Sequence, residues 1–186
     1  QGKTPPDIDN LDLSDAATYQ LIAAGDTSGV FQLESSGMRD LARRLKPENF
    51  AELTAMIALY RPGPMGSGMV DDYVECKHKR KEVVYPLPQL APILNQTFGV
   101  ILYQEQVIRI ANVLADYTMG RADKLRKAMG KKDKAEMAAH RDLFVKGAVK
   151  NGIPEEKAQY IFDLMETFGG YGFNKSHSAA YAMIAF

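Results

Sequence analysis

Residues 38–60 read MRDLARRLKPENFAELTAMIALY, and this stretch decides the fold class. Its apolar side chains recur at the spacing i, i+3, i+4, i+7, first over 38–45 and again over 53–60. Because that spacing puts apolar side chains on one face of an α-helix, it predicts two amphipathic helices. Pro47 stands between them, and we expect it in the first turn of the second helix, where a proline removes no hydrogen bond.

The same periodicity returns later in the chain, over 107–114 and over 158–165. Each of these stretches therefore predicts another amphipathic helix. Asp133 and Glu136 have the spacing of a capping box, which predicts that a further helix begins there and runs to about Asn151.

Three stretches lack the helical pattern. Residues 60–68 and 83–92 are rich in proline or glycine, so we expect rigid loops there. Residues 98–103 are mostly β-branched and aromatic, which is typical of a short strand. The predicted fold is therefore mainly α, a multi-helix domain with Pro/Gly-rich loops and at most a short strand or two.

Length and composition limit the class of protein. A chain of 186 residues with 46% hydrophobic content can bury the core of one domain, or of a domain plus a connector. Its apolar runs are far shorter than the roughly 20 residues that a membrane-spanning helix needs, so we expect no membrane contact and a cytoplasmic location. One cysteine, Cys76, allows neither a disulfide nor a multi-thiolate metal site within the chain. The last expected helix is still apolar at Phe186, so we expect the natural protein to continue.

The net charge is zero, but the charges are distributed unevenly. The first 34 residues carry six carboxylates against Lys3 alone, whereas residues 120–132 carry six cations against Asp123 alone. A second basic run lies at 77–81. The neutral total therefore conceals local basic patches.

The longer basic segment has two faces when it is projected on a helix. Four of its cations fall within about 120° of one another, opposite the apolar side chains. They are Arg121, Lys124, Lys127 and Lys131. Arg126 falls beside the apolar side, where a guanidinium needs a carboxylate, a carbonyl or a phosphate as partner. The pattern fits either a solvated helix surface or a phosphate-binding face.

Residues 174–178 read NKSHS and mark the expected start of the last helix, with Ser176 as its N-cap. The free backbone N–H groups at a helix start favour an anion, which makes Lys175 and His177 candidate phosphate ligands. Simple capping by Ser176 is the alternative interpretation. We expect no Ser–His catalytic pair, because neighbouring residues on a helix point in different directions.

Arg61 follows the second predicted helix and precedes Pro62-Gly63-Pro64. A stiff loop would limit the freedom of this arginine, which suits a binding pocket. The alternative is a turn in which the cation simply matches the C-terminal helix dipole.

Two acidic pairs resemble metal ligands at first sight. Asp7 and Asp9 follow two prolines and fit a solvated connector, and Asp71 and Asp72 fit the first turn of a helix. We expect neither pair to bind metal.

Five segments resemble, in the same order, signature segments of the bacterial C-family replicative DNA polymerases, the DNA polymerase III alpha subunits. They are GVFQLES at 29–35, ALYRPGP at 58–64, GVILYQEQV at 99–107, LRKAMGKK at 125–132 and GFNKSHSAAY at 172–181. The resemblance implies that residues 29–186 are the fingers domain, truncated at its C-terminus, and that residues 1–28 are an acidic connector from a palm domain. The catalytic aspartates and their Mg²⁺ would belong to that palm, so no catalytic or metal-binding residue is expected in this chain.

The resemblance also implies partners and site residues. Template–primer DNA and a deoxynucleoside triphosphate (dNTP) would bind here, and other replicase subunits would bind outside this chain. Phosphate or nucleotide binding is implied for Arg126, Lys127, Lys131, Lys132, Lys175 and His177, and lining of the nascent base-pair pocket for Arg61. Lys127 stands where the family often has a second arginine, so it keeps the charge but loses bidentate geometry.

The nucleotide assignment requires Arg126 and Lys175, on two separate helices, to converge. Two other functions remain open on the residues alone. One is a noncatalytic helical DNA-binding module that uses its basic face on the duplex backbone. The other is a helical scaffold that binds protein partners through an exposed apolar groove.

Overall fold

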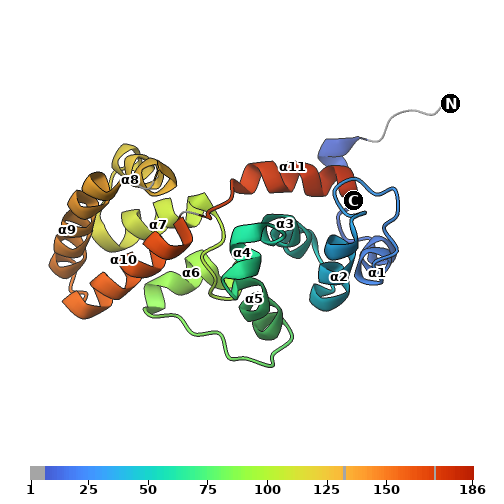
Figure 1. Cartoon of the computed structure of the whole chain (residues 1–186), viewed down its shortest axis with the longest axis horizontal. Helices are drawn as coiled ribbons and strands as arrows, with labels where there is room; N and C mark the ends of the chain where they lie inside the picture. The colour runs from blue at the N-terminus through green and yellow to red at the C-terminus, as the bar shows by residue number, and fades with distance from the viewer. Residues whose placement is uncertain (1–6, 132, 170) are drawn as a thin grey trace.

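The computed structural model describes residues 7–131, 133–169 and 171–186, and within them the chain is mainly α-helical, as predicted (Figure 1). In chain order the elements are η1 (Ile8–Asn10), α1 (Ala16–Ala23), α2 (Ser36–Leu45), α3 (Phe50–Leu59), α4 (Pro62–Gly66), α5 (Met69–Lys77), η2 (Pro88–Leu90), α6 (Ala91–Leu94), η3 (Asn95–Thr97), α7 (Gln104–Ala115), α8 (Met119–Lys131), α9 (Lys134–Lys150), α10 (Glu155–Gly169) and α11 (Lys175–Ala185). None of the described helices is long and apolar enough to cross a membrane.

The helices pack around two hydrophobic cores. One core takes its buried side chains mainly from α1, α2, α3, α5 and α11, and the other takes them mainly from α6 to α10. Figure 1 shows the two groups side by side, with α11 leaving α10 and crossing over α3. The last helix thus joins the core that the first helices build.

The predicted amphipathic helices are confirmed, together with one of their caps. Asp133 accepts hydrogen bonds from the backbone N–H groups of Ala135 and Glu136, and α9 ends before Asn151 as expected. The position predicted for Pro47 is wrong. Asn49 caps α3 by accepting from the backbone N–H of Glu52, so the helix begins after the proline.

Both predicted loops contain short helices. Residues 60–68 include α4, and residues 83–92 include η2 and the start of α6. The sequence interpretation was wrong here because the prolines Pro62, Pro88 and Pro92 occupy first-turn positions, where no backbone N–H is needed.

The predicted strand at 98–103 does not form. In the described residues this region makes only an isolated parallel bridge, between Tyr103 and Phe173. The side chain of Gln106 accepts hydrogen bonds from the N–H groups of Leu102 (2.8 Å) and Tyr103 (2.9 Å). Those donors are therefore unavailable to a neighbouring strand.

Candidate functional site

The basic face of α8 matches the helical projection. The helix buries its apolar residues in the second core and exposes Arg121, Lys124, Lys127 and Lys131. Lys132 lies outside the described residues.

Arg126 lies beside that face, with its side chain 27% exposed. Its Nε and Nη2 are each 2.9 Å from Asp123 Oδ1, and its Nη1 donates to Gln104 Oε1 at 3.1 Å. Lys127 Nζ lies 2.7 Å from Asp123 Oδ2. Hydrogen bonds from Lys127 and Arg126 lower the pKa of the Asp123 carboxyl. The sequence predicted that Arg126 needs a carboxylate, carbonyl or phosphate partner. That partner is the carboxylate of Asp123, one turn earlier on the same helix.

The start of α11 differs from the prediction. Its N-cap is Asn174, whose side chain accepts from the backbone N–H of His177 at 2.8 Å, whereas Ser176 lies inside the first turn. The backbone N–H of Lys175 donates to both carboxylate oxygens of Glu105, at 3.1 Å each. An anion therefore does sit at this helix start, where free N–H groups attract negative charge, but it is a side chain of α7.

Lys175 and His177 point to different neighbours. Lys175 Nζ donates to Gln96 Oε1 at 2.9 Å and lies 5.5 Å from the centroid of the Tyr103 ring. The His177 ring lies 4.2 Å from the ring of Tyr181. The two predicted ligands of α11 are thus held by separate contacts.

Arg61 is fixed by two carbonyl groups and one ring. Its Nε donates to Ala58 O at 2.9 Å, and its Nη2 donates to Tyr171 O at 2.6 Å. Its guanidinium carbon lies 4.4 Å from the centroid of the Phe173 ring. Burial lowers the pKa of the Arg61 guanidinium from its ordinary value. These contacts fasten the end of α3 to residues 171–174, which we call the lead-in segment of α11.

Arg61 and His177 line one pocket of about 650 Å³. Its aromatic lining includes Phe31, Phe173 and Tyr181. The ring of Phe173 lies 5.5 Å from that of His177, and the ring of Tyr181 lies 5.2 Å from that of Phe31. With the His177–Tyr181 contact, these rings form a continuous aromatic row that has Arg61 at one end. Sequence reasoning named none of the three aromatic residues, although they fall inside the segments GVFQLES and GFNKSHSAAY.

The first turn of α7 contacts both of the segments that carry Arg126 and Lys175. Gln104 accepts from Arg126, and the next residue, Glu105, accepts from the backbone of Lys175. The segments that carry Arg126 and Lys175 therefore meet at α7 rather than on opposite sides of the domain. Lys127 contacts Asp123 on the exposed face of α8 and does not line the pocket of Arg61 and His177.

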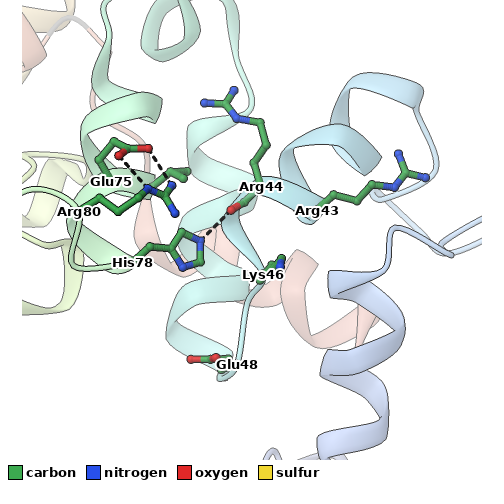
Figure 2. Close-up of a pocket in the computed structure, with 8 residues that line it drawn as sticks. Arg43, Arg44, Lys46, Glu48, Glu75, His78 and Arg80 are labelled. Atoms are coloured by element: carbon green, nitrogen blue, oxygen red, sulfur yellow. Dashed lines mark hydrogen bonds and ion pairs between the residues drawn. The ribbon is translucent and has the colours of Figure 1, made fainter.

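Another pocket, of about 420 Å³ and lined mainly by basic side chains, lies between α2 and α5. Figure 2 shows the guanidinium groups of Arg43 and Arg44 pointing in different directions, while His78 Nε2 lies 2.8 Å from Arg44 O. Arg80 forms a bidentate salt bridge with Glu75, in which Nε donates to Oε2 at 2.9 Å and Nη2 donates to Oε1 at 2.7 Å. The cations of this pocket do not converge on one point.

Asp71 and Asp72 lie in the first turn of α5, as expected, where they pair with Arg44 and Lys81. Among the described residues there is no group of three or more His, Cys, Asp or Glu side chains that could hold a metal ion. Asp71 and Asp72, each paired with a cation, therefore do not fit a two-metal site.

Comparison with known proteins decides the family. The family model described as "Bacterial DNA polymerase III alpha subunit finger domain" matches residues 1–152. The chain belongs to this finger-domain family. It is 53% identical, over its whole length, to DNA polymerase III subunit alpha of Pasteurella multocida (strain Pm70) and of Escherichia coli (strain K12), and 52% identical to that of Pseudomonas aeruginosa PAO1. The chain spans 16% of the length of each of these relatives, and the resemblance seen in its five sequence segments is confirmed.

Proposed function

We propose that this finger domain holds the incoming dNTP against the template–primer in a replicative DNA polymerase. The full-length protein would join the dNTP to the primer 3′ hydroxyl and release pyrophosphate. The observation that carries the proposal is that the segments with Arg126 and Lys175 both contact the first turn of α7: the Arg126 guanidinium donates to Gln104, and the backbone N–H of Lys175 donates to Glu105. Cations that are held at fixed positions can stabilise the charge of a triphosphate without reorganising during the reaction.

The contacts of Arg126 support binding of a phosphate group. Its guanidinium fork is engaged by Asp123, and a carboxylate presents oxygens much as a phosphate does. Salt bridges between solvent-exposed groups contribute little to stability, so a triphosphate can replace Asp123 at low cost. Lys127 and Lys131 would add charge along the same helix, and Lys132, the next residue in the sequence, belongs to the same proposal.

The pocket of Arg61 and His177 supports binding of the base. Stacking of a base on an aromatic ring is worth roughly 1–3 kcal/mol, and the row of rings through Phe173 and Tyr181 offers such faces. Arg61 already binds Ala58 O and Tyr171 O, so in this proposal it shapes the pocket wall and leaves direct recognition to the rings.

The remaining assignments are part of the same proposal. Mg²⁺ would be held by carboxylates of another part of the protein. The boundary between a connector at 1–28 and fingers at 29–186 stays a prediction, as does a cytoplasmic location. Contacts with other replicase subunits are proposed to lie outside this chain.

One observation favours a second function. The exposed row of cations on α8 would also suit a noncatalytic module that binds the backbone of duplex DNA. That function predicts strong, salt-dependent duplex binding by the 186-residue chain alone, whereas the polymerase function predicts weak binding and no nucleotide incorporation by this chain.

Single-nucleotide incorporation by the full-length protein tests the proposal. For Arg126→Ala and Lys175→Ala we expect the nucleotide KM to rise about tenfold or more, equivalent to about 1.4 kcal/mol of lost binding. Lys150→Ala, which removes an exposed cation at the end of α9, serves as the matched control. Unchanged KM and kcat in both site variants would remove the nucleotide assignment.

A further inference from the structure

We propose that Gln104 is the positioning residue for Arg126, and that it holds this guanidinium in register with the lead-in segment of α11. The inference deepens the proposed function and rests on it. It assigns a role to a neutral side chain of α7 that would itself stay clear of the phosphates.

Gln104 makes contacts on two sides at once. Its backbone N–H donates to Phe173 O at 2.9 Å, and its side-chain Nε2 donates to Gly172 O at 3.1 Å. On the other side, its Oε1 accepts from Arg126 Nη1 at 3.1 Å. One amide therefore joins α8 to the lead-in segment.

These two neighbours require a side chain that both donates and accepts a hydrogen bond, as the Gln104 amide does. Gly172 O can only accept a hydrogen bond, and the Arg126 guanidinium can only donate one. A carboxylate at position 104 could not donate to Gly172, and an amine could not accept from Arg126. The two neighbours also fix which end of the Gln104 amide carries the oxygen.

A bound phosphate would displace one partner of Arg126, Asp123, and would leave the other, Gln104, in place. Asp123 is negatively charged and occupies Nε and Nη2, so an incoming phosphate would repel it and compete for those donors. Gln104 is neutral and accepts from a different nitrogen, Nη1, so the phosphate would neither repel it nor compete with it. Asp123 is then the partner that is exchanged, and Gln104 is the partner that holds the guanidinium plane.

The lead-in segment is itself fixed to α7. Phe173 N donates to Leu102 O at 3.0 Å, next to the Gln104–Phe173 hydrogen bond, and Lys175 N donates to the Glu105 carboxylate. Arg61 holds the same segment from the side of α3, through Tyr171 O. Gln104 thus sets the position of Arg126 relative to the pocket that contains His177.

A double-mutant cycle in the full-length protein tests this role. Gln104→Met keeps the length of the side chain but removes its donor and its acceptor. Loss of hydrogen bonds that orient Arg126 is expected to raise the nucleotide KM about three- to tenfold, with a smaller change in kcat. In an Arg126→Ala background the same substitution should change KM by less than about twofold, because the group it positions is gone.

Gln159→Met is the matched control, since Gln159 is exposed on α10 and bonds to Glu155. A Gln104→Met protein with the KM of the parent would overturn the inference. So would an effect of Gln104→Met that persists in full in the Arg126→Ala background, because the residue would then act by another route. If Arg126→Ala itself leaves KM unchanged, the phosphate assignment of the proposed function fails together with the inference, and that outcome is read from the single Arg126 variant alone.

Discussion

Arg61 and Tyr171 are 110 residues apart in the chain and are joined by a 2.6 Å hydrogen bond from Arg61 Nη2 to the Tyr171 carbonyl. The same guanidinium donates to Ala58 O, so one planar group fastens the end of α3 to the lead-in segment of α11. This contact closes one side of the pocket that His177 shares.

The Arg61 contact predicts that lysine cannot replace this arginine. A single ammonium on a flexible stem lacks the planar fork that reaches both carbonyls, so Arg61→Lys should lower the free energy of unfolding by about 1–2 kcal/mol. Urea unfolding of the chain measures this change. Arg109→Lys, at an exposed position of α7, should have little effect; equal stability of the two variants would contradict the prediction.

The cap of α11 gives a second prediction. Asn174→Ala should lower the free energy of unfolding by about 1 kcal/mol, because it removes the acceptor for the backbone N–H of His177. Ser176→Ala should be nearly neutral, since Ser176 lies within the helix and is exposed. Denaturation midpoints of the two variants are compared, and a larger loss for Ser176→Ala would restore Ser176 as the cap.

Substitution by alanine should have different effects on stability at two glycines of neighbouring helices. A Cβ at Gly147 of α9 would lie 2.6 Å from the backbone oxygen of Ala115, so Gly147→Ala should destabilise the chain by about 1–3 kcal/mol through overpacking. A Cβ at Gly120 of α8 would meet nothing within 4 Å, so Gly120→Ala should be neutral or stabilise by up to about 1 kcal/mol. Thermal unfolding of both variants checks the prediction, which a stable Gly147→Ala protein would contradict.

Removal of the hydroxyl group should change stability in opposite directions at two buried tyrosines. Within the described residues, the Tyr73 hydroxyl is buried without a hydrogen-bond partner, whereas the Tyr117 hydroxyl donates to His140 O at 3.0 Å. Tyr73→Phe should therefore raise the free energy of unfolding by about 1 kcal/mol, and Tyr117→Phe should lower it by a similar amount. Chemical denaturation gives both values, and a destabilised Tyr73→Phe protein would indicate a partner for that hydroxyl.

His140 should make stability depend on pH. Burial is the main cause that lowers its pKa below 6.5, and the nearby Arg121 and Lys124 act in the same direction against Glu136. The folded state therefore binds fewer protons at this site than the unfolded state. The contribution of neutral His140 to stability is complete above pH 6.5 and is lost as the pH falls from 6.5 through the folded-state pKa.

Unfolding free energies measured at about pH 7.5 and about pH 5.5 test this sign. The wild-type chain should lose more stability between the two values than His140→Gln, which does not titrate. An identical pH dependence in the two proteins would exclude His140 as the cause.

Local features of the sequence determined most of the helical content. The spacing over 38–45 and over 107–114 predicted α2 and α7, and Asp133 marked the start of α9. The two faces of α8 also followed from spacing alone. These features were predictable because helix periodicity and capping involve residues within a few positions of one another. The five segments were likewise enough to indicate the finger-domain family, because each of them is a continuous string of residues.

Only the tertiary structure decided which groups meet. Residues 98–103 have a strand-like composition, but the side chain of Gln106 and the two adjoining cores hold them in another conformation. The anion at the start of α11 is Glu105, and the partner of Arg61 is a carbonyl 110 residues away. Such partners depend on how distant helices pack, so neither periodicity nor the composition of a short segment contains them.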